Sequence, residues 1–335
     1  MRKDNWKKLV AFVVLCGLAT TFVLPFVWML STSLKHESRI FTQPPQWIPT
    51  TEVTDAQGRP QVAFLEGAKE KFGDAIGTDL GSDEAGKHRV LVNGAEQEVW
   101  SEEIEPLQKV GFHWANYTRA FEMMHFWRNL RNTLFICFTT VIGTVVSSAL
   151  VAYGFARIKF PFRDALFMVV LATMMLPYQV TLIPLFALYS KLGWNGTFLP
   201  LIVPYFFGVP FYIFLLRQFF MGIPEDLSAA ARIDGCSELG IFTKVMLPLS
   251  KPALATTALF MFLFQWGDFL NPLIYLQDDL QYTLAVALQQ FQSQHESAWG
   301  PLMAMSTVIT LPIIVLFFLT QRTFIEGITM SGLKG

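Results

Sequence analysis

The side chains best suited to chemistry lie in two apolar stretches. Trp266, Asp268 and Asn271 stand close together in QWGDFLNPL. Tyr178 and Gln179 are adjacent in an earlier stretch. A carboxylate inside an apolar run is costly to bury, so it indicates a polar cavity or a transport path. Aromatic rings and amides can stack on a sugar and hydrogen-bond to its hydroxyls, although rings in membrane helices more often pack or act as interfacial anchors.

No catalytic constellation accompanies these residues. The five histidines are scattered without a second ligand at helical spacing, which is typical of surface histidines: His36, His88, His113, His125 and His295. Cys16, Cys137 and Cys236 show neither a disulfide framework nor metal-ligand spacing. No GxxxxGK[ST] phosphate loop is present, so ATP would be hydrolysed by another polypeptide. We predict a protein that is not an enzyme and binds no cofactor or metal.

Composition defines the elements that must position these residues. The 335 residues are 53% hydrophobic and 15% charged, and the mean hydropathy is +0.41. This profile is typical of a polytopic membrane protein. A net charge of −1 gives no electrostatic case for nucleic-acid binding. The sequence therefore predicts an all-α membrane protein.

Six apolar segments are long enough to span a bilayer, and they are residues 9–34, 132–156, 165–192, 197–220, 253–276 and 301–320. We interpret the first as a retained helix rather than a cleaved signal peptide, because no small-residue cleavage site follows it. An even number of spans places both termini on one side. The domains predicted from this pattern are residues 1–34, an outer loop at 35–128 and a five-helix core at 129–335.

Charge bias orients these spans. Basic residues gather in the loops on one side, which the positive-inside rule makes cytoplasmic. They are Arg157, Lys159, Arg163, Arg217, Arg232, Lys244, Lys251, Arg322 and Lys334. Both termini and the polar segment 223–252 are therefore predicted to be cytoplasmic, and the loop at 35–128 faces outward. Prolines interrupt the third and fourth spans, which is typical of helices that line a path.

The outer loop contains an insert at about 51–110. HRVLV and AEQEVW flank Asn93-Gly94, a dipeptide that readily forms a type I′ turn. We predict a small β-rich extracytoplasmic insert. The alternative is a partly disordered loop.

The polar segment 223–252 carries helix signals. Pro224 suits a first helical residue, Glu225 and Asp226 suit the first turn, and Gly235 suits a helix end. Small and apolar residues form the predicted face of this helix: Leu227, Ala230, Ala231 and Ile233. We expect a short, smooth helix followed by a turn.

The spacing in this segment resembles a known family. The pattern is similar to the EAA loop, EAA-x3-G-x9-I-x-LP. Here it is formed by Ala229-Ala230-Ala231, then Gly235 after three residues, Val245 after nine more, and Leu247-Pro248 after one more. That loop belongs to permease subunits of binding-protein-dependent ABC importers. Ala229 stands where the family has Glu, which removes a carboxylate that could make a polar contact, and Val245 stands for Ile.

Further motifs resemble the carbohydrate branch, the MalG-like permeases. They are PPQWIP, NYTRAF, AYGFARIKFPFR, MLPYQVTLIPLF, LPLSKPAL and the tail ITMSGLKG. The resemblance covers nearly the whole chain except residues 51–110. It implies the six-helix fold of type I ABC importer permeases, the MetI-like fold, in a bacterial or archaeal cytoplasmic membrane.

The resemblance also implies partners and roles. They are a second permease subunit, two ATPase subunits that carry ATP and Mg, and an extracytoplasmic solute-binding protein that delivers a sugar or oligosaccharide. The EAA loop would supply a coupling helix that docks on the ATPase, with Glu225, Ala229, Ala230, Ala231, Asp234, Gly235, Leu247 and Pro248 as coupling residues. Tyr178, Gln179, Trp266, Asp268 and Asn271 remain the candidate path residues.

Three alternatives stay open. Asp268 could be a structural carboxylate near the outer interface, or the coupling site of an ion-driven secondary transporter. The chain could be an ABC permease for a solute other than a sugar. It could also be a membrane scaffold that displays the insert.

Overall fold

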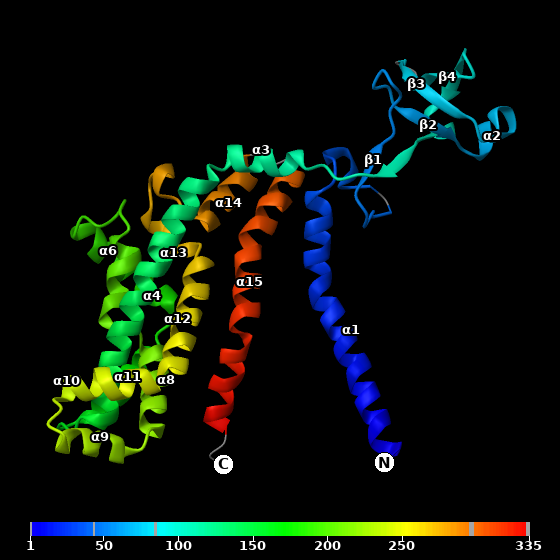
Figure 1. Cartoon of the computed structure of the whole chain (residues 1–335). Helices are drawn as coiled ribbons and strands as arrows, with labels where there is room; N and C mark the ends of the chain where they lie inside the picture. The colour runs from blue at the N-terminus through cyan, green and yellow to red at the C-terminus, as the bar shows by residue number, and fades with distance from the viewer. Residues whose placement is uncertain (1, 43, 84–85, 295–297, 333–335) are drawn as a thin grey trace. The chain divides into compact units, whose positions relative to one another are not determined.

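The computed structural model describes residues 2–42, 44–83, 86–294 and 298–332 (Figure 1). His295 and Lys334 lie outside the described residues, as does the side chain of Arg322. Contacts divide the chain into two units. The first unit comprises Met1–Met123 and His295–Val308, and the second comprises Met124–Gln294 and Ile309–Gly335.

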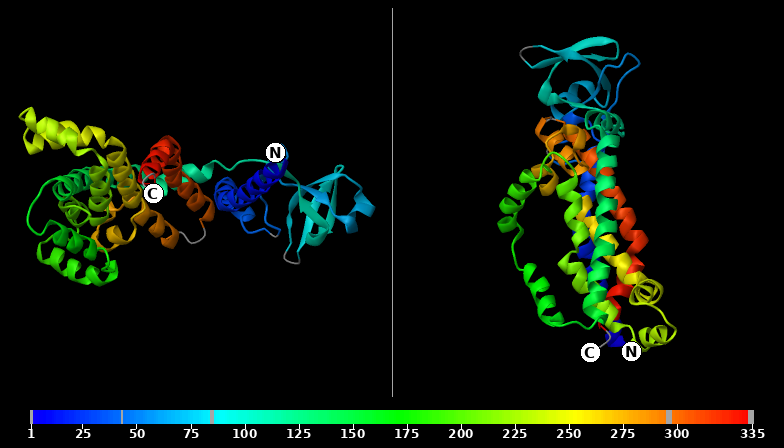
Figure 2. Two further views of the ribbon diagram at one scale, coloured as in Figure 1. Left: turned by 90° about the horizontal axis from the view of Figure 1, so that it is seen from below. Right: turned by 90° about the vertical axis from the view of Figure 1, so that its left-hand side faces the viewer.

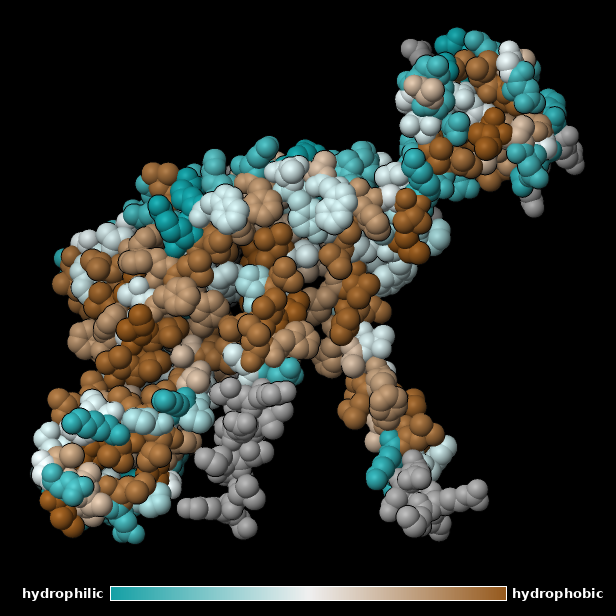
Figure 3. All heavy atoms as spheres, viewed as in Figure 1, coloured by the Kyte–Doolittle hydropathy of each residue, from teal (hydrophilic) through white to brown (hydrophobic). Residues whose placement is uncertain are grey.

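Four described helices are long and apolar enough to cross a membrane, and up to six spans result if each of two bent pairs counts as one. The four are Trp6–Ser33, Phe126–Arg157, Leu199–Gly222 and Trp299–Gln321. The bent pairs are Arg163–Thr173 with Tyr178–Lys191, at 93°, and Glu238–Leu249 with Lys251–Trp266, at 79°. Hydrophobic residues, brown in Figure 3, cover much of the visible side of the second unit.

Two predicted spans are interrupted. The span expected at 165–192 is divided into α5 (Arg163–Thr173) and α6 (Tyr178–Lys191). Pro177 precedes α6, and a proline disfavours helical backbone at the residue before it. The span expected at 253–276 is likewise divided into α12 (Lys251–Trp266) and α13 (Leu270–Tyr275). Asp268 lies in the break.

The second unit is built around α4 (Phe126–Arg157). Figures 1 and 2 show α8 (Pro210–Gly222) and α12 alongside it. Towards its C-terminal end, α4 contributes Ala149, Ala152 and Tyr153 to a buried apolar cluster. The remaining elements of this unit are α7 (Leu199–Ile202), η3 (Val203–Phe207), α9 (Glu225–Ile233), α10 (Glu238–Ile241), a π-helix (Phe242–Met246), α11 (Leu247–Leu249), η5 (Asp279–Gln281) and α14 (Leu284–Gln294). α15 (Trp299–Gly332) belongs to both units.

Serines on α4 replace a backbone bond that the proline-rich segment before α8 has lost. Ser147 Oγ shares its hydrogen between the carbonyl of Gly143 in its own helix, at 2.7 Å, and that of Tyr205, at 3.2 Å, and Ser148 Oγ accepts from the amide of Val209 at 3.2 Å. In a continuous helix these two backbone groups would bond to each other. The broken helix is therefore tolerated in an apolar setting because its neighbour satisfies the freed groups.

Gly143 allows α4 to approach this broken segment closely. A Cβ at Gly143 would lie 2.7 Å from ring atoms of Phe206, a separation that requires the ring or the backbone to move. A Cβ at Gly154, further along the same helix, would meet open space, with no neighbouring atom within 4 Å. The two glycines therefore differ in the room that surrounds them.

The first unit contains α1 (Arg2–Ser33), η1 (Glu37–Arg39), α3 (Ala115–Met123) and the insert. An antiparallel sheet with strand order β5-β4-β3-β2-β6 forms the insert. Its elements are β2 (Gln61–Phe64), α2 (Glu66–Phe72), β3 (Ile76–Ser82), β4 (Lys87–Val92), β5 (Ala95–Trp100), η2 (Ser101–Glu103) and β6 (Ile104–Pro106). Asn93 and Gly94 both have positive φ, and β4 pairs with β5 across them, which is the predicted hairpin.

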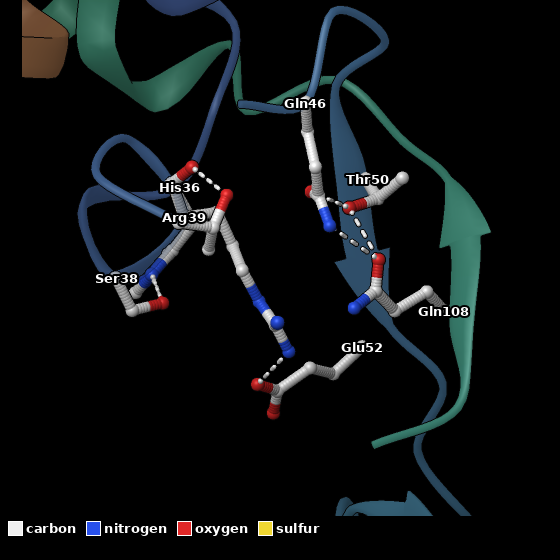
Figure 4. Close-up of polar contacts among 8 residues, drawn as sticks. His36, Ser38, Arg39, Gln46, Thr50, Glu52 and Gln108 are labelled. Carbon is white, nitrogen blue, oxygen red and sulfur yellow. Dashed lines mark hydrogen bonds and ion pairs between the residues drawn. The ribbon is translucent and has the colours of Figure 1, made fainter. Parts of the chain in front are cut away.

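A narrow neck joins the insert to the rest of this unit (Figure 4). β1 (Thr50–Glu52) pairs with β7 (Gln108–Val110), so the chain enters and leaves the insert through adjacent strands. Gln108 Oε1 accepts from Thr50 at 3.0 Å and from Gln46 at 3.3 Å, and Arg39 forms an ion pair with Glu52 at 3.0 Å.

Asn116 of the NYTRAF motif donates to the carbonyls of Ser33 and Lys35 at 2.9 and 2.8 Å. These bonds tie α3 and the end of α1 together.

A matched pair of substitutions tests the close approach at Gly143. Replacing a helical glycine by alanine stabilises a helix by about 1 kcal/mol when nothing is in the way. Gly154→Ala should therefore keep or raise the thermal unfolding midpoint of the purified protein in detergent. Gly143→Ala should lower it, because its methyl group meets the ring of Phe206. Equal midpoints for the two variants would show that α4 does not depend on this contact.

Candidate functional site

α9 (Glu225–Ile233) is the helix expected in the polar segment. Glu225 and Asp226 lie in its first turn, as predicted, where carboxylates favour the helix dipole. Pro224 is the N-cap rather than the first helical residue, because its ψ of 134° is extended. The shift by one position is small, since proline lacks an N–H and neither position requires one.

Gly235 ends α9 in a Schellman turn. Its φ is +79°, its amide donates to the carbonyl of Arg232 at 3.0 Å, and the amide of Cys236 donates to that of Ala231 at 2.9 Å. These are the two bonds that define the motif. An added Cβ would have open space around it. The position therefore requires glycine for its backbone conformation and not for lack of room.

The four residues predicted to form one face of α9 do not all point the same way. Ala231 is buried in the apolar cluster that includes Ile241 and Phe242. Leu227 and Ala230 are exposed, and Ile233 is 86% exposed. Successive helical residues differ in direction by about 100°, so adjacent alanines cannot share one narrow face. The small side chain of Ala231 lets α9 pack on its own chain, and the outward surface is formed by Leu227, Ala230 and Ile233.

The other predicted coupling residues surround this surface. Glu225, Ala229 and Asp234 are exposed. Leu247 and Pro248 lie on α11, beyond the π-helix, with Leu247 packed against the same apolar cluster and Pro248 exposed. Hydrophilic residues, teal in Figure 3, appear at the end of the second unit that carries α9 and α10.

A carboxylate connects α9 to α10 and α4. Glu238, the first residue of α10, accepts from Arg232 Nε at 2.8 Å through Oε1 and from the Tyr153 hydroxyl at 2.7 Å through Oε2. Arg232 is at the end of α9, and its hydrogen bond to Glu238 raises the pKa of its guanidinium above the ordinary value. The side chain of Tyr153 is only 5% exposed and packs on the ring of Phe242, 5.1 Å between centroids.

Arg157 holds the opposite end of the segment. Its Nη2 donates to the carbonyl of Phe220 at 2.6 Å and also to that of Ile223. Phe220 lies in the last turn of α8 and Ile223 is its C-cap, and the Phe220 carbonyl also accepts from the Ile223 amide at 3.2 Å. Sequence reasoning missed Tyr153, Arg157 and Glu238 as site residues. The available signal was the four-residue spacing of Tyr153 and Arg157 in AYGFAR, which puts them on one helix face.

A second polar cluster lies at the break between α12 and α13. Asp268 Oδ2 accepts from the side-chain Nδ2 of Asn271 at 2.9 Å, and Asp268 Oδ1 accepts from the backbone amide of Asn271 at 3.2 Å. The Tyr178 hydroxyl of α6 donates to Asn271 Oδ1. Asp268 is half-buried, and no basic side chain pairs with it among the described residues. A carboxylate, an amide and a phenol thus lie in one chain of hydrogen bonds that links α6 to the break.

The remaining two candidate path residues lie apart from this chain. The Trp266 side chain is buried, its indole N–H donates to the carbonyl of Ile309 at 3.3 Å, and it stacks on Phe262. It packs rather than faces a path. Gln179 is exposed. The described residues contain no group of three or more His, Cys, Asp or Glu that could hold a metal ion.

The helical part of the chain is similar to known transport proteins. The family model described as "Binding-protein-dependent transport system inner membrane component" matches residues 131–329. The arabinooligosaccharide transport permease AraQ of Halalkalibacterium halodurans is 37% identical over 210 residues, covering 63% of this chain and 75% of that protein. The trehalose/maltose permease MalG of Thermococcus litoralis and the trehalose permease SugB of Mycobacterium tuberculosis are each 36% identical, covering 66% of this chain and 81% of those proteins.

A solved structure shares the fold. A bacterial ABC transporter involved in the import of the acidic polysaccharide alginate aligns over 96% of this chain and 98% of its own, with a TM-score of 0.70 and 19% identity. The helices and the α9 segment define a multi-pass membrane transport component. The chain belongs to the family of inner membrane components of binding-protein-dependent transport systems. It is a permease subunit of an ABC importer and not an enzyme.

The cluster at Asp268 predicts a specific effect of Asp268→Asn. The amide keeps one acceptor oxygen and gains a donor that opposes Asn271 Nδ2, so one of the two bonds to Asn271 is lost. We expect uptake by the reconstituted transporter to fall about tenfold, the effect of losing one hydrogen bond to a charged group. Assembly with partner subunits, measured by co-purification, should be unchanged. Asp279→Asn, which changes an exposed carboxylate outside the candidate path, is the control and should leave uptake unchanged. Loss of assembly together with uptake would instead identify Asp268 as a structural carboxylate.

Proposed function

We propose that this chain is the permease subunit through which a sugar or oligosaccharide enters the cytoplasm, driven by ATP hydrolysed on separate ATPase subunits. The observation that carries the proposal is α9, a short helix with an exposed apolar surface, an EAA-type spacing and a Schellman turn at Gly235. Relatives named for arabinooligosaccharide, trehalose and maltose transport support the sugar.

The proposed assembly has four further parts. A second permease subunit completes the path, two ATPase subunits bind ATP and Mg, and an extracytoplasmic solute-binding protein delivers the sugar. In this proposal the chain makes six spans in a bacterial or archaeal cytoplasmic membrane, with both termini and the α9 segment in the cytoplasm. The bent pair of α5 and α6 then counts as one span, and α12 with α13 forms another, while Glu238–Leu249 remains in the cytoplasmic segment, as the charge bias of the loops favours.

Docking would use the outward surface of α9. Leu227, Ala230 and Ile233 form an apolar surface that fits a groove on an ATPase subunit, while Ala231 packs inward. Ala229 replaces the carboxylate of the family pattern, so apolar contact provides most of the docking free energy here. Closure of the ATPase subunits would move α9 and shift the helices between inward-open and outward-open states.

Reconstitution tests the function directly. The chain would be co-expressed with its partner permease and ATPase subunits and placed in proteoliposomes with the solute-binding protein and a panel of labelled maltose, trehalose and arabino-oligosaccharides. We expect uptake that requires ATP and a stimulation of ATP hydrolysis by the loaded binding protein. Uptake driven by a proton or sodium gradient without ATP would identify an ion-coupled transporter. ATP-dependent uptake of a different solute would retain the importer and reject the sugar.

The Schellman turn predicts the effects of substituting Gly235. A β-branched residue is strongly disfavoured at φ +79°, by about 1–2 kcal/mol or more, whereas asparagine tolerates this region. Gly235→Val should therefore reduce uptake about tenfold while the chain remains in the membrane, and Gly235→Asn should retain most of it. Because open space surrounds the position, side-chain volume alone cannot produce this difference. Equal uptake by the two variants would reject a coupling role for the turn.

The insert is proposed as a docking module for an outer partner. The Val53 amide donates to the carbonyl of Leu107 at 2.8 Å next to the β1–β7 pair, so residues 54–106 can be replaced by Asn-Gly to form a two-residue hairpin. This variant should assemble normally but bind the solute-binding protein at least about tenfold more weakly, as expected when a central contact is removed. The affinity is measured with the transporter in nanodiscs. Unchanged affinity and uptake would make the insert a passive elaboration.

A further inference from the structure

Two side chains on one face of α4 contact both ends of the α9 segment. Tyr153 and Arg157 are four residues apart, one helical turn, so they project in the same direction. Arg157 binds the carbonyls of Phe220 and Ile223, before α9 begins. Tyr153 binds Glu238, just after α9 and its turn have ended. All of α9 therefore lies between two attachment points on a single helix.

The attachment at the far end is itself fixed to α9. Glu238 uses one carboxylate oxygen for Tyr153 and the other for Arg232, the next-to-last residue of α9. The Ser237 hydroxyl accepts from the Gly240 amide at 3.2 Å and caps α10, which places Glu238 in the first turn. A displacement of α9 therefore pulls on Tyr153 through Glu238.

α4 extends from this point along the second unit. Its 32 residues correspond to a length of about 48 Å. Near its N-terminal end, Thr133 Oγ1 accepts from the amide of Leu284 at 2.9 Å, and Asn132 donates to the carbonyl of Leu280 at 2.9 Å. Ser147 and Ser148 bind the segment before α8. One rigid helix thus joins the α9 segment to the loops at the opposite end.

We propose that Tyr153 and Arg157 are positioning residues that attach α9 to α4 at two points and make α4 the helix that carries the displacement of α9 through the permease. The inference rests on the function proposed above, and it assigns the role to residues outside the EAA-type spacing. Two points of attachment matter because one contact would let α9 pivot. With both ends held, α9 can move only together with α4.

Conservative substitutions test the attachments in the complete reconstituted transporter. Tyr153→Phe removes only the hydroxyl, and Arg157→Lys keeps the charge but loses the planar guanidinium. Each should lower the number of sugar molecules taken up per ATP hydrolysed by about tenfold, the loss expected for one hydrogen bond to a charged group. The sugar is whichever of trehalose, maltose or arabino-oligosaccharide the wild type imports. The KM for ATP should stay unchanged, because no ATP contact is altered.

A matched control separates this role from general packing. Tyr212 on α8 is buried like Tyr153 but makes no side-chain hydrogen bond among the described residues. Tyr212→Phe should therefore leave the sugar-to-ATP ratio at the wild-type value. Tyr153→Phe should also add little to Glu238→Gln, because both changes weaken the same bond. Additive effects, or equal effects of Tyr153→Phe and Tyr212→Phe, would overturn the proposal.

A distance measurement tests the attachment without transport. Spin labels would be placed at Asp226→Cys on α9, outside the proposed docking residues, and at Leu150→Cys on α4, both exposed, after replacing the three native cysteines. We expect one narrow distance distribution in the otherwise native complex and a broad one when Tyr153→Phe and Arg157→Lys are combined. An unchanged narrow distribution would reject the two-point attachment.

The two readouts distinguish the levels of failure. A wild-type complex that shows no ATP-dependent uptake of any of the three sugars would reject the proposed function. The spin-label distances would still decide the attachment, because they require no substrate. An active wild type whose variants keep both the sugar-to-ATP ratio and the narrow distance would reject the attachment alone.

Discussion

The geometry of the α9 segment depends on two hydrogen bonds that the Glu238 carboxylate accepts, one from Arg232 and one from Tyr153. An exposed ion pair such as Arg232–Glu238 is worth little by itself, because water and salt screen it. The second oxygen bonds to Tyr153, whose ring is fixed in the apolar core. Because Tyr153 is buried and fixed, it holds Glu238 in one position, and Glu238 in turn holds Arg232 at the end of α9.

Glycine and serine residues determine how α4 packs against its neighbours. Gly143 lets the helix approach the ring of Phe206, and Ser147 and Ser148 occupy the backbone groups that prolines leave free. These contacts are short-range and directional, so they favour discrete arrangements of packed helices over gradual deformation. A transporter that alternates between two states needs helices of this kind.

The insert and the helical part follow different constraints. The family model covers residues 131–329 and leaves the five-stranded sheet outside. The paired strands β1 and β7 bring the chain into and out of the insert side by side. Its own core, with Val62, Phe64 and Val90, makes it a compact addition to the first unit.

The sequence by itself determined the apolar segments, the Asn93-Gly94 hairpin, the bounds of α9 within one residue and the need for glycine at 235, because hydropathy, turn preference and helix capping act between near neighbours. It also placed Asp268, Asn271 and Tyr178 among the candidate residues. It could not decide that these three would form one hydrogen-bonded chain without Trp266 and Gln179, or that Ala231 would face inward. Only the tertiary structure brought Tyr153 to Glu238 and Arg157 to Ile223, since such contacts join residues more than sixty positions apart. Their partners are set by how the helices pack, which no local pattern encodes.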